Sequence, residues 1–278
     1  MMRVNTFLER YWATVTAISM MAVVVLCNTN GTVIKAQNTA PSLFITSAHP
    51  ESIDIGNPIL QQDVPEQILY RKGYVVSYNK DTRLPNWVAW HLTSSHTTGE
   101  HKRPNNAFHE DQDVPLPRAT NFDFKDSGWS RGHLCPAGDN KWDPEAMYES
   151  FLLSNVCPQH PTLNSGVWNQ IEITCRTWAE RYGDIYIVSG PVFYNQEHKT
   201  IGSNEVVVPE AFFKVVICLN GNPKGIGFIC RNTGGSEKKD LYVNTISQVE
   251  RITKIKFFPN LQEHIAEKLK SDANIEKW

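Results

Sequence analysis

The sequence predicts a mixed α+β fold, because strand-like and helix-like segments follow one another along most of its 278 residues. Short runs rich in Val, Ile, Tyr and Trp are bounded by turn residues, as strands are. Residues 165–182 repeat apolar side chains at intervals of three and four, which is the pattern of a helix with one buried face. A hydrophobic content of 41% with 10% aromatic residues is typical of a chain with a packed core.

The first 36 residues have the layout of a signal peptide. Arg3 and Arg10 precede an uncharged stretch from Tyr11 to Ile34, and cleavage after Ala36 would place a small residue at the cut. This layout predicts an exported protein, periplasmic or secreted. The alternatives are an uncleaved membrane anchor and a lipid on Cys27.

The charge balance excludes a strongly basic chain. The full sequence has 27 basic and 29 acidic residues, and removal of residues 1–36 would leave 24 and 28. Binding to a nucleic acid would therefore need a local Arg or Lys cluster, or a bound cation.

Five cysteines follow the predicted leader, and none is spaced as Cys-x-x-Cys, which argues against zinc-ribbon and thioredoxin-like sites. In an exported chain we expect one or two disulfides and a leftover thiol. The pairing is open from sequence: Cys135 and Cys157 are one candidate pair, and Cys175 competes with them.

Residues 37–65 are polar and interrupted by proline, which predicts a linker or N-terminal arm. A single domain is expected over residues 66–270, with a C-terminal tail at 271–278. Its first strands are predicted at Ile68–Tyr78 and Trp87–Leu92. Residues 93–119 form a long polar loop, and its length suggests a surface function.

The middle of the chain predicts a turn followed by two helices. Residues 130–141 hold two glycines and a proline, and we expect a shaped turn there. A short helix is predicted at Pro144–Leu153 with Asp143 as its N-cap, followed by irregular structure at 155–166. The helix at 165–182 should end at Gly183 as a C-cap.

The last third predicts more strands and two closing helices. Residues 220–224 have hairpin chemistry and should join two of the strands. The expected strands are Ile185–Ser189, Val206–Val208, Phe212–Leu219 and Gly225–Cys230, and the expected helices are Ser247–Ile252 and Leu261–Leu269.

Several side chains after residue 130 suit phosphodiester hydrolysis. His133 lies two residues after Arg131, and Asn164 stands at the start of the long helix. An imidazole can activate water, a guanidinium matches phosphate oxygens, and a carboxamide oxygen is a hard ligand for Mg²⁺. Glu172 follows Asn164 by about two helical turns, so both can line one site. Each also has a structural explanation, as a turn histidine, a helix cap or an exposed helix glutamate.

Taken in order, the motifs of this chain resemble those of the DNA/RNA non-specific endonucleases. The matching segments are Asn86–His91, Arg131–His133, Ser154–Gln159, Leu163-Asn164, and Trp168 with Glu172. This family belongs to the ββα-metal, or His-Me finger, superfamily and includes endonuclease G. The resemblance covers about residues 68–260 and implies a central antiparallel sheet flanked by helices.

The resemblance also implies a role for each matching residue. The reaction would be hydrolysis of DNA and RNA to 5′-phosphate products through phosphate contacts, which carry no base information. Mg²⁺ would be the metal, with Mn²⁺ as a substitute, and a protein inhibitor is a further candidate partner. The implied roles are general base for His133, metal ligand for Asn164, ordering of metal-bound water for Glu172, phosphate contacts for Arg131 and Arg103, and support of the His133 loop for Asn155.

One position departs from the family pattern, because Ser130 stands where Asp usually precedes Arg-Gly-His. Exonuclease-G-like members are similar in carrying serine, so activity is expected, while the balance of endonuclease and exonuclease action is open. The competing interpretation is a catalytically decayed nucleic-acid-binding module. A zinc hydrolase lacks support, since no HExxH motif is present. With an ordinary histidine pKa, the rate should fall between pH 8 and about 5.

Overall fold

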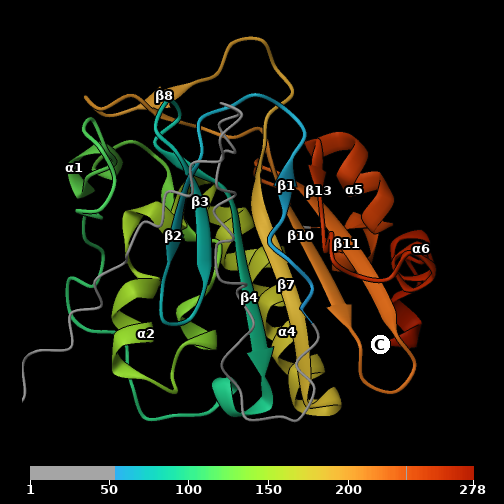
Figure 1. The fold of residues 1–278 in the computed structure, drawn as a ribbon. Helices are drawn as coiled ribbons and strands as arrows, with labels where there is room; N and C mark the ends of the chain where they lie inside the picture. The colour runs from blue at the N-terminus through green and yellow to red at the C-terminus, as the bar shows by residue number, and fades with distance from the viewer. Residues whose placement is uncertain (1–53, 236) are drawn as a thin grey trace, which may run out of the picture. The chain divides into compact units, whose positions relative to one another are not determined.

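The computed structural model describes residues 54–235 and 237–278 (Figure 1). The predicted signal peptide and most of the predicted arm lie outside the described residues, so the predictions made from them stay predictions. Within the described ranges, no helix is long and apolar enough to cross a membrane.

A seven-stranded sheet forms the centre of the fold, and every neighbouring pair of its strands is antiparallel. The predicted α+β class and its central antiparallel sheet are thereby confirmed. In spatial order the strands are β12 (Val243–Asn244), β11 (Lys224–Arg231), β10 (Ala211–Cys218), β7 (Asp184–Val192), β4 (Leu84–Thr93), β3 (Val75–Asn79) and β2 (Gln67–Tyr70).

Both faces of this sheet are buried. Successive side chains of a strand point to opposite faces, and on β4 Val88 and Trp90 join one apolar cluster while Ala89 joins the other. Helices α2 (Pro144–Ser150) and α4 (Asn169–Tyr182) contribute to the first cluster. Helices α5 (Ile246–Thr253) and α6 (Glu263–Ser271) contribute to the second. Double coverage explains why the central strands are continuous apolar runs in the sequence.

A small hairpin leads into α4 and gives the fold its ββα unit. Strand β5 (Ser130–His133) pairs antiparallel with β6 (Val156–Gln159), and His133 lies opposite Val156. The turn predicted at 130–141 and the irregular structure predicted at 155–166 are therefore wrong at these strands. Gly132 fits in β5 because a Cβ there would lie 2.2 Å from the Gln159 side chain.

Several local predictions are confirmed in detail. The Asp143 side chain accepts hydrogen bonds from the backbone N–H groups of Glu145 and Ala146, at 2.8 and 3.0 Å, and so caps α2. Helix α4 ends at Gly183, whose φ of 92° lies in the region that favours glycine. Strands β10 and β11 form the predicted hairpin. The two closing helices are α5 and α6.

Other bounds differ from the predictions for local reasons. The strand predicted at 68–78 is two strands, β2 and β3, because the chain turns where Arg71 N donates to Tyr74 O at 2.8 Å. Helix α4 begins at Asn169, since Gly166 in the preceding π-type segment leaves the helical region, with φ −97° and ψ −115°. Val206–Val207 pair with β8 instead of joining the central sheet.

The remaining elements are short. The strands are β1 (Ile59–Leu60), β8 (Thr200–Ile201), β9 (Val206–Val207) and β13 (Ile255–Lys256). The helical turns are α1 (Asn121–Phe124), α3 (Pro161–Leu163), the π-type turn Asn164–Trp168, and 3-10 turns at Ser94–Thr97, Ala137–Asp139, Leu153–Asn155, Lys239–Tyr242 and Ile275–Lys277.

Both ends of the described chain pack on the domain. Within the segment assigned to the arm, β1 pairs with β13. Within the segment assigned to the tail, the Trp278 ring lies 4.2 Å from the Trp178 ring, centroid to centroid, and Arg181 donates to the Trp278 carbonyl at 3.0 Å.

The cysteines correct the disulfide prediction. All five described cysteines are free and buried, and Cys135 and Cys157 are not bridged. All five belong to the first apolar cluster of the core, and burial raises the pKa of every one of these thiols. The prediction rested on the compartment assumed for the chain, and the structure uses these side chains as small core residues instead.

Candidate active site

His133 lies at the end of β5 with its ring enclosed by aromatic side chains. Its centroid is 5.0 Å from that of Phe108 and 5.0 Å from that of Phe151. The Nε2 atom is buried and has no hydrogen-bond partner among the described residues. Burial, and to a lesser extent the nearby charge of Arg103, lowers the pKa of His133 to about 3. At neutral pH the imidazole is therefore uncharged and able to accept a proton.

Asn155 fixes the backbone that follows His133. This side chain is fully buried, and its Oδ1 accepts from Cys135 N at 3.0 Å while its Nδ2 donates to Cys135 O at 2.8 Å. The same Nδ2 donates to Ser150 O at 2.8 Å, and the Asn155 carbonyl accepts from Leu134 N at 3.0 Å. These contacts join the His133 loop to the end of α2.

Arg131 and Arg103 converge on the aromatic ring that also touches His133. Their guanidinium carbons lie 4.7 and 5.1 Å from the Phe108 centroid, and Arg103 lies 5.3 Å from the Phe151 centroid. Desolvation and the charge of Arg103 lower the pKa of Arg131. Among the described residues neither arginine has a carboxylate partner, and Arg131 donates only to Asn121 Oδ1, at 2.6 Å. Two uncompensated cations beside a neutral base form an anion-binding surface.

Asn164 lies where α3 passes into the π-type turn before α4. Its backbone N–H donates to His160 O at 2.9 Å, and its side chain makes no hydrogen bond with another described residue. One helical turn later, Trp168 Nε1 donates to the His133 carbonyl at 3.3 Å. The indole therefore joins the segment that carries Asn164 to the strand that carries His133.

Glu172 lies in the first turn of α4 and is half-buried. Burial raises its carboxyl pKa to about 7, while the charges of Lys214 and Arg176 oppose that rise. A carboxyl whose pKa is near 7 can change its protonation with small changes in nearby charge. Of the six predicted site residues, the structure places Arg131 and His133 on β5 and Glu172 on α4. Asn155 and Asn164 lie in the helical turns before β6 and α4, and Arg103 lies in a loop.

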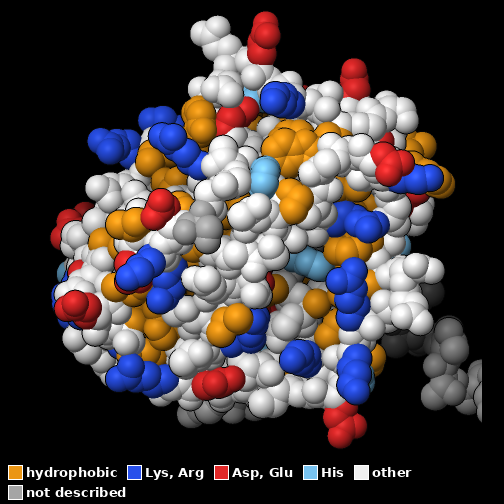
Figure 2. All heavy atoms as spheres, turned by 180° about the vertical axis from the view of Figure 1, so that it is seen from behind, with side chains coloured by type: hydrophobic (Ala, Val, Ile, Leu, Met, Phe, Trp, Pro, Cys, Tyr) orange, Lys and Arg blue, Asp and Glu red, His pale blue; other side chains and the backbone are white. Residues whose placement is uncertain are grey.

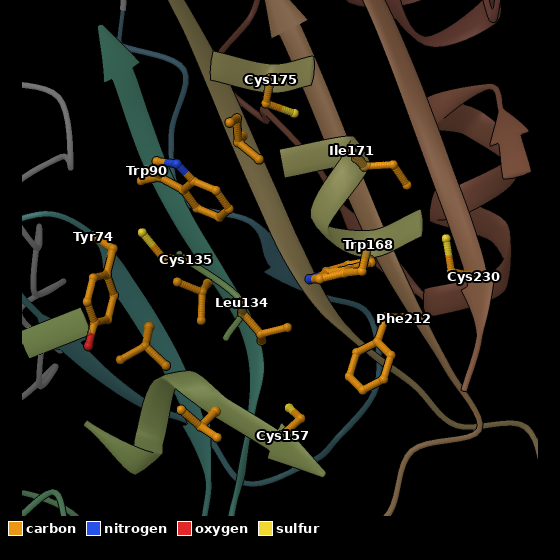
Figure 3. Close-up of a cluster of buried hydrophobic side chains, with 14 of the residues drawn as sticks. Tyr74, Trp90, Leu134, Cys135, Cys157, Trp168, Ile171, Cys175, Phe212 and Cys230 are labelled. Carbon is orange, nitrogen blue, oxygen red and sulfur yellow. The ribbon is translucent and has the colours of Figure 1, made fainter. Parts of the chain in front are cut away.

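Two features of this region were missed from the sequence. Lys214 is 1% exposed and its Nζ donates to the carbonyl of Leu134, next to His133, at 3.3 Å. The ammonium lies 4.8 Å from the Trp90 ring and 4.7 Å from the Trp168 ring, two side chains that Figure 3 shows in one buried cluster with Leu134. The sequence contained one sign of this feature, because Lys214 is a charged residue inside the apolar run Phe212–Leu219.

The second feature that the sequence did not predict is an ion pair between the buried Asp139 and the half-buried Arg176. Arg176 donates to Asp139 Oδ1 at 2.9 Å, and Trp90 Nε1 donates to Asp139 Oδ2 at 3.1 Å. Asp139 follows His133 on the loop, and Arg176 belongs to α4. The pair therefore joins the loop to the helix from the core side, as Trp168 does nearer His133.

The donor set decides which metal fits. Within the described residues, no group of three or more His, Cys, Asp and Glu side chains could hold an ion. Asn164 offers a carboxamide oxygen with no competing hydrogen bond from another described residue, and Glu172 adds a carboxyl in the first turn of the helix that follows. Few hard oxygen donors suit an ion that keeps most of its waters, as Mg²⁺ does. These residues fit Mg²⁺ and do not form a zinc site.

Comparisons with known proteins agree with this geometry. The family model for DNA/RNA non-specific endonucleases matches residues 51–264. Mitochondrial nuclease EXOG of Danio rerio is 37% identical over 207 residues, which are 69% of this chain and 60% of that protein. Nuclease C1 of Cunninghamella echinulata var. echinulata is 34% identical over 233 residues, which are 77% of this chain and 90% of that one.

A solved structure shows the same fold. An EndoG/EndoGI complex matches with a TM-score of 0.69 and 25% identity, over 79% of this chain and 94% of that chain. The chain spans about 60% of the length of the EXOG relative, so the family is established for the matched region. On the family match and these identities, the chain belongs to the DNA/RNA non-specific endonuclease family.

Proposed function

We propose that this chain is a hydrolytic nuclease that cleaves the phosphodiester bonds of DNA and RNA and depends on Mg²⁺. The observation that carries the proposal is the uncharged imidazole of His133 beside the two uncompensated guanidiniums of Arg103 and Arg131. The two relatives named above are nucleases, and this supports the reaction class.

Each residue has a different role in the proposed hydrolysis. Arg103 and Arg131 bind the phosphate that is to be cleaved. His133 accepts the proton of the attacking water as the new O–P bond forms. The P–O3′ bond breaks, the electron pair leaves with O3′, and solvent supplies its proton, so that the products are a 5′-phosphate and a 3′-hydroxyl.

Asn164 would hold the metal through its carboxamide oxygen, and Glu172 would orient water beside it. When bound, Mg²⁺ supplies positive charge for the departing oxygen, and Mn²⁺ is a chemically similar substitute. Asn155 acts only through the backbone, because its side chain holds the loop that carries His133. Contacts to phosphate alone give a nuclease without base preference.

Digestion of plasmid DNA and of RNA, with Mg²⁺ and with EDTA, tests the proposal. The wild type should degrade both substrates only with Mg²⁺, and His133→Ala should lose cleavage while it still binds DNA. His264→Ala, on the exposed side of α6, is the matched control and should cleave as wild type does. Binding without cleavage by the wild type would favour the decayed-module alternative, and cleavage by His133→Ala would remove the base.

Export and inhibition are separate parts of the proposal. The signal-peptide layout of residues 1–36 supports export. If these residues are not cleaved, they would instead anchor the protein in a membrane. Mass spectrometry of the isolated protein would identify its N-terminus and so separate the two alternatives. A protein inhibitor is supported by the neighbour solved as an EndoG/EndoGI complex. An inhibitor of this kind would have to cover the anion-binding surface formed by Arg103 and Arg131.

A further inference from the structure

Phe122 is a large apolar side chain that the fold leaves in solvent. It is 82% exposed, whereas Phe124, two residues later on the same helical turn α1, is 6% exposed. A pocket of about 280 Å³ opens beside it, lined by Asn121, Phe122, Phe124, Lys125 and Arg131. Its walls thus combine one free aromatic face with two basic side chains.

The turn that presents Phe122 is held in place on both sides. The Asp123 carboxylate accepts from Thr120 N at 2.7 Å and from Asn204 N at 3.1 Å, and so joins α1 to the loop between β8 and β9. Asn121 Nδ2 donates to the carbonyl of Phe108 at 2.7 Å. Phe122 therefore remains exposed on a fixed turn rather than on a free loop.

The pocket adjoins the proposed phosphate site. Arg131 lines the pocket and also lies over the Phe108 ring, which touches His133. Residues 131 and 133 are two apart on β5, so their side chains leave the strand on the same side. Arg131 is therefore shared by the pocket and the proposed phosphate site.

The charge around the pocket favours a polyanion. Lys125 and Arg131 are basic, and none of the residues that line the pocket is acidic. The carboxylate of Asp123, which belongs to the same helical turn, is buried and accepts hydrogen bonds from Thr120 and Asn204. Figure 2 shows Lys and Arg side chains spread over the face of the molecule that is seen from behind, with Asp and Glu side chains among them and at its margin. The two basic residues of the pocket give it a local positive charge, although the total charge of the chain is slightly negative.

We infer that this pocket is a subsite for a nucleotide next to the cleaved phosphate, with its base stacked on Phe122 and its phosphate held by Lys125 and Arg131. The inference rests on the proposed function and adds a substrate preference to it. A base can stack on Phe122 only when it is unpaired, and every base has a π-face. The subsite therefore selects single-stranded or frayed nucleic acid without selecting a sequence.

Binding of a single-stranded 12-mer that carries 2-aminopurine tests the subsite, in EDTA so that the strand stays intact. Loss of an aromatic side chain that stacks on a base typically weakens binding by about 5- to 30-fold, and larger effects occur. Phe122→Ala should weaken binding by about that factor and remove the fluorescence quenching, and Phe122→Trp should restore both. Ile252→Ala, an exposed apolar residue of α5 on the other face of the sheet, is the control.

The phosphate contact has its own readout. Lys125→Gln should lower the slope of log affinity against log salt by about 0.7 for a single strand, because one fewer counterion is released. Circular dichroism of each variant checks that it is folded.

The outcomes separate this inference from the proposed function. If the wild type cleaves but Phe122→Ala binds and quenches as the wild type does, the subsite is refuted and the nuclease stands. If the wild type stacks the base but never cleaves with Mg²⁺, the subsite stands and the nuclease is refuted. If the wild type does not bind the strand in EDTA, the subsite is refuted, and digestion with Mg²⁺ decides separately whether the chain is a nuclease.

Discussion

Replacing His133 by Asn should change how the stability of the protein depends on pH. In the unfolded chain this histidine titrates near pH 6.5, whereas burial lowers its pKa in the folded protein to about 3. Between these values the unfolded state binds a proton that the folded state does not. The wild type therefore loses stability as the pH falls from about 6.5 towards 3.

The size of the effect follows from the two pKa values. Each pH unit below the unfolded pKa costs about 1.4 kcal/mol until the folded pKa is reached. From pH 7 to pH 5 the wild type should lose about 2 kcal/mol of unfolding free energy through His133 alone. His133→Asn has no such proton and should lose correspondingly less.

Urea unfolding of both proteins at pH 7 and pH 5 measures this difference. Other titrating groups shift both proteins equally, so the quantity of interest is the change in their difference. His264→Asn, on the exposed side of α6, is the control, because it removes a histidine that is not buried. Parallel losses in wild type and His133→Asn, equal within about 0.5 kcal/mol, would refute the buried, uncharged imidazole.

Three further substitutions test the surroundings of the site. Asn155→Ala leaves Cys135 N, Cys135 O and Ser150 O without their hydrogen-bond partner. This variant should lower the free energy of unfolding, measured in urea, by about 3 kcal/mol. The control Asn195→Ala, at an exposed position, should change it little. Gly132→Ala puts a Cβ 2.2 Å from the Gln159 side chain and should cost about 1–3 kcal/mol in the same assay; an unchanged midpoint would contradict the close packing of β5 on β6. Asn164→Ala should abolish both Mg²⁺ binding, measured by calorimetry, and Mg²⁺-dependent cleavage. The control Asn169→Ala, at a nearby exposed position, should keep both. If Asn164→Ala still binds Mg²⁺, the ion lies elsewhere.

The depressed pKa of His133 corrects the activity profile expected from the sequence. An ordinary histidine would become protonated between pH 8 and 5, and the rate would fall with it. With a folded pKa of about 3, His133 stays uncharged across that range in the free protein. A fall in rate between pH 8 and 5 would then have to come from another group.

Sequence patterns predicted the helices and turns that are determined by residues close together in the chain. The apolar period of three and four gave α4, and Asp143 and Gly183 marked helix ends that the structure contains. The turn at residues 220–224 predicted the β10–β11 hairpin. In each case the residues that decide the structure lie within a few positions of one another.

Strands β5 and β6 were not predictable in the same way. They are separated by 22 residues, and Gly132 and Pro158 lower the strand propensity of both. Only their pairing in the folded chain makes them strands. The disulfide prediction was wrong for a related reason, since cysteine counts carry no information on which side chains meet.

For the site, the sequence supplied residue types and the family resemblance supplied their roles. Neither indicated that Phe108 and Phe151 enclose the imidazole, because the three residues come from separate segments. The position of Lys214 between two tryptophan rings is likewise a product of long-range packing. These contacts set the pKa of the base and the place of its loop, and they follow from the fold alone.

In the proposed mechanism, His133 and Asn164 act on one phosphate. A crystal structure of His133→Ala with Mg²⁺ and an uncleaved DNA strand would show whether they do. We expect the ion at about 2.1 Å from the Asn164 carboxamide oxygen, with the bound phosphate between that ion and the space left at residue 133. An ion bound away from Asn164, or a phosphate that reaches only one of the two positions, would contradict it.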